Sequence, residues 1–266
     1  MTTKTVHIDD KNQIEAFLRK NVFLNIYSLG DLDDFFRPYT NWYALTNTEG
    51  IKAIVLVYMS GSLPCLHALT ESENIHYMEE LLQSLIPIFP ERFYAHLSLG
   101  LEGALGKHYS LKSHGEHYKM ALTKKYLLSR VDTSEVIALS ISDLDEIVSL
   151  FEAAYPENWF DPRLLDTNQY YGIRESSKLI SVAGVHVYSR RYRVAALGNI
   201  TTHPEYRGKG YGTAVTAGVC KSLLREIDHV GLNVKTDNTS AIRCYEKLGF
   251  EILDSYGEYE VEHLPS

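Results

Sequence analysis

Three glycines and two cations stand close together in the segment TTHPEYRGKGYGTAV, residues 201–215. An apolar stretch precedes the segment and a run with helical spacing follows it, so the pattern predicts a strand, a loop and a helix in succession. Glycines let the loop backbone turn, and the first N–H groups of the helix stay unpaired. Together with the positive end of the helix dipole, these N–H groups would favour a bound phosphate or pyrophosphate.

Two common nucleotide-binding motifs do not fit this loop. A Walker loop requires Ser or Thr after its lysine, but Gly210 follows Lys209. A dinucleotide fingerprint requires a third glycine where Thr213 stands, and an acidic residue at the end of the next strand, which GLNV lacks. The structural alternative is a tight turn in which Arg207 and Lys209 are ordinary solvated charges.

A second polar segment, NVKTDNTSAIRCYEKLGFE, occupies residues 233–251. Helical spacing places Asn238, Ala241 or Ile242, Tyr245 and Gly249 on one face of a helix. That face carries a polar group, small groups and one phenol. Asn238 could contact a ligand or could only cap the helix, a position that asparagine favours.

In this order, the two segments resemble the signatures of the GNAT acetyltransferase superfamily. RGKGYG fits the R/Q-x-x-G-x-G/A pattern, and the second segment matches at Asn238, Ala241, Tyr245, Gly249 and Phe250. The resemblance covers about residues 179 to 254. The N-terminal part resembles a degenerate copy without the glycine loop, a tandem layout similar to that of glycine N-acyltransferase-like proteins.

The resemblance implies that acetyl-CoA or another short acyl-CoA is the co-substrate, with no metal. Its pyrophosphate would lie on the amides of residues 208 to 213. Its pantetheine would lie between the strands GNITT and GLNVK, which splay apart in the family. The implied cofactor-binding residues are Ile200, Thr202, Arg207, Gly208, Lys209, Gly210, Tyr211, Gly212, Thr213, Asn233, Asn238 and Ala241.

By the same resemblance, Tyr245 is the catalytic acid that protonates the departing CoA sulfur. Acyl transfer also needs a donor for the oxyanion, and we expect a backbone amide in residues 198–202 to supply it. A core aromatic residue is the alternative role for Tyr245. The strand VAALGNITT lacks the glutamate that some members use as a base, which leaves a water chain, Glu157, Asp161 or His186 as candidates.

The function that these residues predict is N-acetyl transfer from acetyl-CoA to the primary amine of a small molecule, with an amino acid as one candidate acceptor. One alternative is a CoA-binding sensor without turnover, although a pure binder has no evident need for Tyr245. Another is O-acyl transfer, which would need a stronger base. We expect a monomer or a homodimer.

The composition excludes several other classes. Net charge is −8 without a basic tract, which argues against a nucleic-acid partner. The three cysteines are far apart, and we expect His108, His114 and His117 to be loop histidines, so no metal site is predicted. The N-terminus lacks a signal-peptide pattern and the longest apolar run is far too short for a membrane helix, so we expect a cytoplasmic protein.

Hydrophobic periodicity and turn residues give an α/β (α+β) fold of two domains, 1–130 and 131–266. Each is expected to hold a mixed, mostly antiparallel twisted sheet flanked by helices. By the resemblance, the second would bind acyl-CoA and the degenerate first would shape the acceptor site. The expected helices are 9–20, one within 25–36, 73–89, one from Ser142 or Asp143 to before Pro156, a short one near Pro162, 211–227 and 238–249. The expected strands are 41–47, 51–59, 65–70, 92–98, 117–123, 169–175, 178–189, 194–202, 229–236 and, as a strand or hairpin, 250–263.

Overall fold

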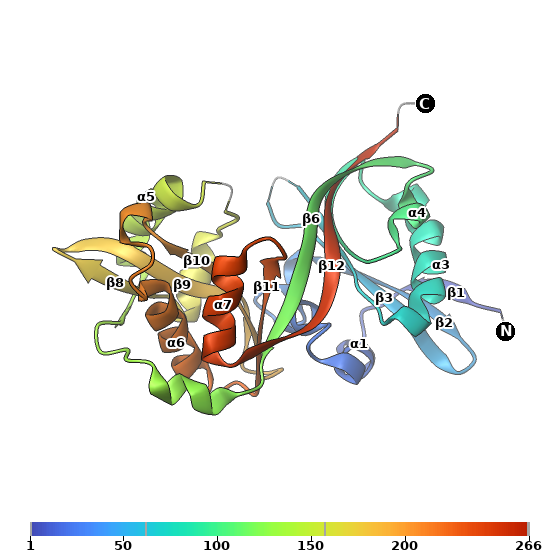
Figure 1. Ribbon diagram of the computed structural model, residues 1–266. Coiled ribbons are helices and arrows are strands. Elements are labelled where there is room, and N and C mark those ends of the chain that lie inside the picture. Colours follow the sequence, from blue (N-terminus) through green and yellow to red (C-terminus); the bar gives the residue numbers. More distant parts are fainter. Residues whose placement is uncertain (1, 62, 157, 265–266) are drawn as a thin grey trace. The chain divides into compact units, whose positions relative to one another are not determined.

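The computed structural model describes residues 2–61, 63–156 and 158–264, which fall into two compact units (Figure 1). Unit 1 comprises Met1–Lys119 and Leu253–Ser266, and unit 2 comprises Met120–Ile252. The division therefore differs from the predicted ranges 1–130 and 131–266. The reason is that the last strand of the chain crosses back and pairs with a strand of unit 1.

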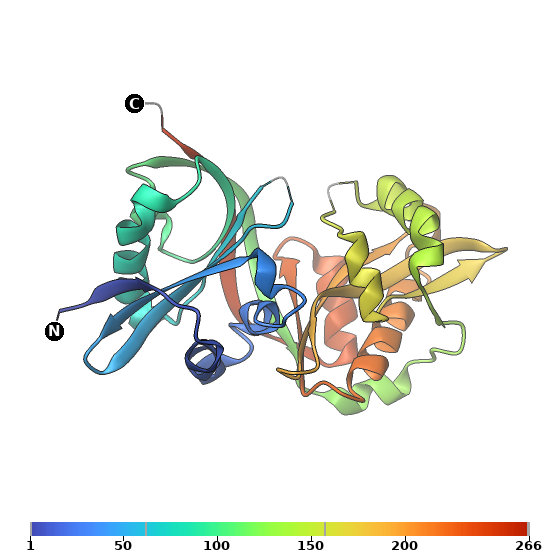
Figure 2. The same ribbon diagram turned by 180° about the vertical axis from the view of Figure 1, so that it is seen from behind.

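Unit 2 holds a mixed sheet in which β6 is followed in order by β11, β10, β9, β8 and β7. Neighbours from β7 to β10 are antiparallel, whereas β10 and β11 are parallel and are joined by the helix α6. Helices α6 and α7 lie on the side seen in Figure 1, and α5 lies on the side seen in Figure 2. The bounds are β7 Ile137–Ala138, α5 Leu144–Ala154, β8 Tyr171–Glu175, β9 Lys178–Ser189, β10 Val194–Thr202, α6 Tyr211–Leu223, β11 His229–Lys235 and α7 Thr239–Leu248.

Unit 1 holds strands β1 to β5 in sequence order, followed by β12 and β6. Strands β1 to β4 form an antiparallel meander, and the helix α3 connects the parallel pair β4 and β5. The strands β6 and β12 each have residues in both units. The bounds are β1 Lys4–His7, α1 Lys11–Leu18, α2 Ile26–Asp31, β2 Thr40–Asn47, β3 Gly50–Tyr58, β4 Cys65–Ala68, α3 Ile75–Leu85, β5 Arg92–Ser98, α4 Glu102–Leu105, β6 Tyr109–Leu122 and β12 Phe250–His263.

The predicted fold class is confirmed, and capping residues mark the start of α1 and the end of α7. Asp10 caps α1 by accepting from the backbone N–H groups of Asn12 and Gln13. Gly249 follows α7 with φ of 99°, a left-handed conformation that glycine adopts without strain. The sequence missed the short elements β1 and α4. His114, expected in a loop, lies in the strand β6 because that strand starts earlier than the expected residue 117, and His117 also lies in β6 and not in a loop.

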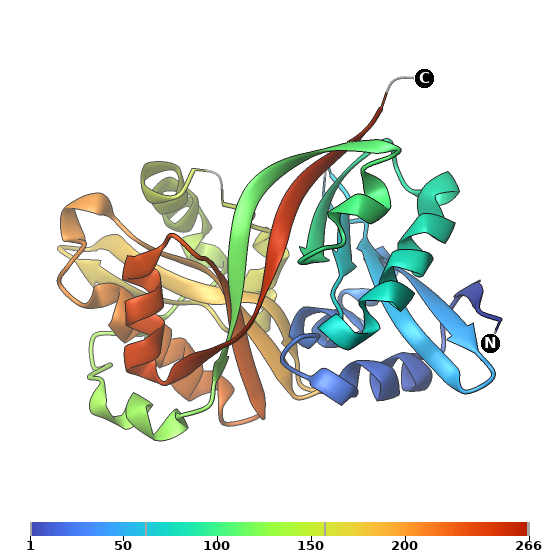
Figure 3. The same cartoon turned by 45° about the vertical axis from the view of Figure 1, so that its right-hand side comes forward.

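The two faces of the unit 1 sheet differ in what covers them. On one face, alternate residues of β3, β4 and β5 pack with α3, shown in teal in Figure 3, around a core that includes Val55, Leu66 and Leu82. Because side chains alternate along a strand, the residues between them point to the opposite face. That face receives α2, in which every residue is buried, including the carboxylate-bearing Asp31.

We predict that Asp31 makes the stability of the protein depend on pH. Burial raises its pKa from 3.8 to about 8, and no described residue donates a hydrogen bond to its carboxylate. Between these two values the folded chain binds more protons than the unfolded chain, so the free energy of unfolding falls as pH rises. In Asp31→Asn, most of this fall, on the order of 2 to 5 kcal/mol from pH 5 to pH 8.5, should disappear from urea unfolding curves.

The exposed Asp166 provides the matched control. Asp166→Asn should keep the pH dependence of the wild-type protein. An unchanged slope in Asp31→Asn would show that the Asp31 carboxyl is not protonated by burial.

Candidate functional site

The glycine loop has the geometry of an anion-binding turn. After the short helix Pro204–Tyr206, Gly208 and Gly210 adopt φ of 80° and 90°, and α6 begins at Tyr211. A Cβ atom at either glycine would find no heavy atom within 4 Å, so the space beside the loop is open. None of the backbone N–H groups from Gly208 to Thr213 donates to a described residue. These groups therefore remain available at the positive end of the α6 dipole.

The two loop cations have different surroundings. The Arg207 guanidinium donates to the backbone carbonyls of Thr202 and Ala154, both at 3.1 Å. The Lys209 Nζ atom lies 5.1 Å from the centre of the Tyr206 ring. Arg207 thus ties the loop to the end of β10 and to the end of α5. Its predicted contact with a cofactor stays a prediction.

The strands β10 and β11 separate before they end. They pair in parallel from Val194 and His229 to Leu197 and Leu232, and no register continues beyond that point. The remaining residues of β10, up to Thr202, therefore have unpaired backbone groups on their β11 side. The expected splaying of GNITT and GLNVK is present in the structure. An extended ligand could form hydrogen bonds there as an added strand does.

A bulge lies in β10 at the start of this opening. The register with β9 passes from Gly198 to Thr201, so Asn199 and Ile200 have no partner in β9. Asn199 has φ of 56°, a conformation that asparagine tolerates better than most residues. Its buried amide donates to the Tyr170 hydroxyl at 2.6 Å, which holds the bulge in place. The bulge therefore turns the Ile200 backbone away from both neighbouring strands.

A histidine lies beside this bulge. The Nε2 atom of His186 is 3.4 Å from the Asn199 Oδ1 atom, and its ring meets the Trp159 ring edge to face at 5.8 Å. A Cβ atom at Gly198 would lie 2.2 Å from the His186 ring. The absence of a side chain at Gly198 is therefore what lets the imidazole lie over β10. The sequence named His186 only as one of several bases and missed Asn199 and Tyr170, because the bulge has no sequence signal.

Tyr245 lies on α7, which packs against α6. The residue is 7% exposed, and its ring lies 5.9 Å from that of Phe250, centre to centre. Burial, with nearby Cys244, Tyr155 and Cys220, raises the pKa of the Tyr245 phenol. The phenol therefore stays protonated at neutral pH, as a proton donor must.

Other predicted residues also surround the loop. The Asn238 Oδ1 atom accepts from the Ala241 N–H at 3.1 Å, so Asn238 caps α7 whether or not it also contacts a ligand. The Thr213 hydroxyl lies 3.2 Å from the Cys244 sulfur, which joins the first turn of α6 to α7. A Cβ atom at Gly212 would lie 3.3 Å from the Thr202 hydroxyl, so the helix starts close to the strand end.

The three side chains predicted as candidate bases differ in their surroundings. Glu157 lies outside the described residues. Both carboxylate oxygens of Asp161 accept a hydrogen bond from Arg163 Nε. Burial raises the pKa of Asp161, but the hydrogen bonds and charge of Arg163 outweigh burial, so the pKa is lowered. A carboxylate so engaged is a weak base. Of these candidates, only His186 contacts the bulge among the described residues.

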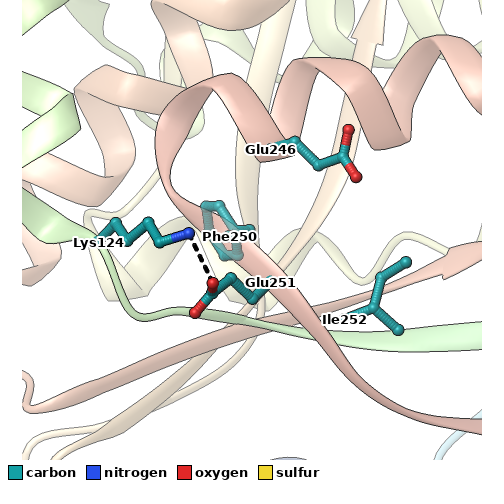
Figure 4. A pocket seen from close by; sticks show the side chains of 5 residues that line it. All are labelled: Lys124, Glu246, Phe250, Glu251 and Ile252. Atoms are coloured by element: carbon teal, nitrogen blue, oxygen red, sulfur yellow. Dashed lines mark ion pairs between the residues drawn. The ribbon is translucent and has the colours of Figure 1, made fainter.

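A shallow hollow in unit 2 lies away from these features. It is lined by Lys124, Glu246, Phe250, Glu251 and Ile252 (Figure 4). An ion pair of 2.7 Å joins Lys124 and Glu251 across it. Because Glu246 and the residues after it lie at the C-terminal end of α7, the hollow is distant from the capped N-terminus of that helix. It includes none of the residues of the glycine loop or of the bulge.

Comparison with known proteins agrees with this geometry. The model of the acetyltransferase (GNAT) family matches residues 139–250. An acetyltransferase of Sodalis glossinidius is 30% identical over 128 residues, which cover 46% of this chain and 89% of that protein. The chain belongs to the GNAT acetyltransferase family. As a GNAT protein it is an acetyltransferase, and the glycine loop and the bulge both lie within the matched range.

Solved structures extend the GNAT fold over the whole chain. A protein of Drosophila has a TM-score of 0.71 at 12% identity over 98% of each chain. A tandem GNAT protein from the clavulanic acid biosynthesis pathway has a TM-score of 0.57 at 14% identity over 100% of both chains. Identities this low show likeness of fold alone. Within the described part of the chain, no helix combines the length and apolar character needed to span a membrane.

We predict that Gly210→Glu abolishes binding of acetyl-CoA, the donor that the family generally uses. The glutamate would place a negative charge in the open space beside the loop, where the pyrophosphate is expected. Isothermal titration calorimetry should show affinity at least about 100-fold weaker, which corresponds to roughly 2.7 kcal/mol.

Gly50→Glu is the matched control, since Gly50 also has positive φ, of 117°, and open space around it. Both variants should lose about 1 to 2 kcal/mol of stability from backbone strain, but only Gly210→Glu should lose binding. Acetyl-CoA affinity within twofold of wild type in Gly210→Glu would exclude the loop as the pyrophosphate site.

Proposed function

We propose that this protein is an N-acetyltransferase that moves an acetyl or other short acyl group from acyl-CoA to the primary amine of a small molecule. The observation that carries the proposal is the separation of β10 and β11 after Leu197 and Leu232, with unpaired loop amides at the end of β10. An acyl-CoA has both an extended amide-containing arm and a pyrophosphate. The open side of β10 suits the extended arm, and the unpaired amides of the glycine loop suit the pyrophosphate.

In this proposal the co-substrate binds along the open side of β10. The pantetheine amides form hydrogen bonds with backbone groups of Ile200 and Thr202, and the pyrophosphate accepts from the N–H groups of residues 208 to 213. Lys209, which is part of this loop, adds a positive charge. Of the other site residues that the family resemblance implies, Asn233 lies in β11 and Ala241 in the first turn of α7.

The bulge supplies the oxyanion donor. The amine nitrogen attacks the thioester carbonyl carbon, and negative charge develops on the carbonyl oxygen. A backbone N–H of the bulge, at Ile200, donates a hydrogen bond to that oxygen. Because Asn199 is held through Tyr170, the donor keeps its position without reorganisation during the reaction.

Two side chains handle the protons. His186 accepts the proton that the attacking ammonium must lose, directly or through one water molecule. When the carbon–sulfur bond breaks, the CoA thiolate takes the phenolic proton of Tyr245. The nitrogen loses its second proton to solvent as the tetrahedral intermediate collapses to the amide. Solvent also returns a proton to Tyr245 and removes the one on His186, so the protein leaves the cycle unchanged.

The proposal also includes the acceptor, the role of unit 1, and the location and oligomeric state of the protein. The acceptor is a small-molecule amine, with an amino acid as one candidate, and neither nucleic acid nor a membrane takes part. Unit 1, which repeats the meander and the helical crossover of unit 2, is a second GNAT-like domain without the glycine loop. We place the protein in the cytoplasm, as a monomer or homodimer.

A screen with acetyl-CoA and a library of amines and alcohols tests the proposed reaction. Release of free CoA thiol should depend on an amine, and mass spectrometry should find the N-acetylated product. Turnover with alcohols alone would replace the proposal by O-acyl transfer. Tight acetyl-CoA binding without thiol release for any acceptor would indicate a sensor.

Tyr245→Phe should lower kcat by about 10²- to 10⁴-fold, because it removes the acid for the CoA sulfur. Acetyl-CoA affinity should change by less than about threefold, since the aromatic ring remains in place. Steady-state kinetics and calorimetry on the same preparation measure both values. The exposed Tyr126, changed to Phe as a control, should leave both unchanged; wild-type kcat in Tyr245→Phe would remove the residue as the acid.

His186→Gln should lower kcat/KM for the amine by about 10²-fold or more at neutral pH. Glutamine keeps a polar side chain beside Asn199 but cannot take a proton. The loss should shrink as pH rises, because a growing fraction of the amine is then already unprotonated. A loss of equal size at every pH would identify His186 as a structural residue of the bulge.

A further inference from the structure

Three side chains with metal-binding atoms meet on one face of the unit 1 sheet. Cys65 and His67 are two residues apart in β4, so they point to the same side of the strand. His67 pairs with His96 of the neighbouring parallel strand β5. Leu66 and Ala68 belong to the core on the α3 face, so the three polar side chains lie on the opposite face.

The donor atoms are close enough for one ion. One ligand atom from each of Cys65, His67 and His96 lies within 4.8 Å of the other two. A tetrahedral zinc ion with Zn–N of about 2.0 to 2.1 Å and Zn–S of about 2.3 Å needs donors roughly 3.3 to 3.6 Å apart. Side-chain rotations that close the cluster by about 1 Å would satisfy this spacing, since the strand register already aligns the three residues.

A buried nitrogen in the cluster has no partner. His67 is 8% exposed, and its Nδ1 atom makes no hydrogen bond with any described residue. Its ring stacks on His96 with centroids 4.8 Å apart, and the Tyr27 ring of α2 meets it edge to face at 6.3 Å. Leaving a buried polar nitrogen unsatisfied costs about 1 to 3 kcal/mol, a cost that a bound ion would remove.

We propose that Cys65, His67 and His96 form a binding site for one divalent transition-metal ion of the zinc type. Thiolate and imidazole donors select zinc, cobalt or nickel over magnesium or calcium. Three protein donors leave a fourth position for water or a small ligand. The site belongs to unit 1 and is separate from the acyl-CoA residues, all of which lie in unit 2.

A carboxylate network orients one of the ligands. Glu258 of β12 lies 3.5 Å from His96 Nε2, and it accepts hydrogen bonds from the hydroxyls of Tyr94 and Tyr256 at 2.5 and 2.6 Å. Carboxylates that contact a metal-binding imidazole fix its ring orientation and strengthen it as a donor. Glu258 also supplies a negative charge that helps to balance the ion.

The positive charge of the buried Lys119 would repel a metal ion bound by the three residues. Its Nζ atom lies 5.3 Å and 5.1 Å from the ring centres of Tyr27 and Tyr256, which stabilise its charge by cation–π contact. The charges of the Cys65 thiolate and Glu258 offset it. The proposal therefore requires the thiolate, and a test must detect a metal–sulfur bond.

Titration of the metal-free full-length protein with Co²⁺ detects that bond by visible absorption. We expect one equivalent to bind, with a thiolate-to-cobalt charge-transfer band and the intense visible bands of tetrahedral cobalt, and we expect Zn²⁺ to displace it. Cys65→Ser should lose the charge-transfer band and bind cobalt more than about 100-fold more weakly. His67→Gln and His96→Gln should weaken binding similarly, and Glu258→Gln by about 10- to 100-fold.

The controls are Cys220→Ser and His108→Asn, which change the same residue types outside the cluster and should bind cobalt like the wild type. Circular dichroism and urea unfolding curves report whether each variant is folded. The proposal is wrong if the wild-type protein shows no saturable cobalt binding, or if folded Cys65→Ser keeps the charge-transfer band. Because binding is read without turnover, the result is independent of the proposed acetyl transfer.

Discussion

The separation of the parallel strands β10 and β11 is the constraint on which the rest of the candidate site in unit 2 depends. Strands β10 and β11 share a register only as far as Leu197 and Leu232, so the end of β10 has backbone groups that no strand satisfies. Solvent or a ligand must satisfy them, because unpaired backbone groups are costly when buried. The opening is thus a local loss of sheet hydrogen bonds and, in our proposal, the surface that binds acyl-CoA. The bulge at Asn199, held by Tyr170, gives it a defined start.

The glycine loop and the two helices complete the surface that the strands begin. Gly208 and Gly210 supply the positive φ values that let the chain leave β10 and enter α6 directly. Arg207 fastens the loop to the strand end, and the contact of Thr213 with Cys244 joins α6 to α7. These two contacts connect the end of β10 with the loop, and α6 with α7.

The sequence predicted the features that follow from local patterns. Strands β9 and β10 have the expected bounds, and Asn238 caps α7 as its residue type indicated. It could not predict the bulge, since the left-handed Asn199 depends on a tertiary bond. Nor could it predict the pairing of β12 with β5, which moves Leu253–Ser266 into unit 1. The cluster of Cys65, His67 and His96 was missed because it needs the register of two strands, although the alternation Cys-Leu-His was a partial signal.

The central claim is that acyl-CoA binds in the opening of β10 and on the adjacent loop. Amide hydrogen exchange of the full-length protein, with and without acetyl-CoA, tests it directly because each backbone N–H reports its own protection. The account predicts slower exchange at Ile200 and Thr202 and from Gly208 to Thr213, with little change in β1 to β4. Protection confined to unit 1, or unchanged exchange in residues 198–213 at saturating acetyl-CoA, would contradict it.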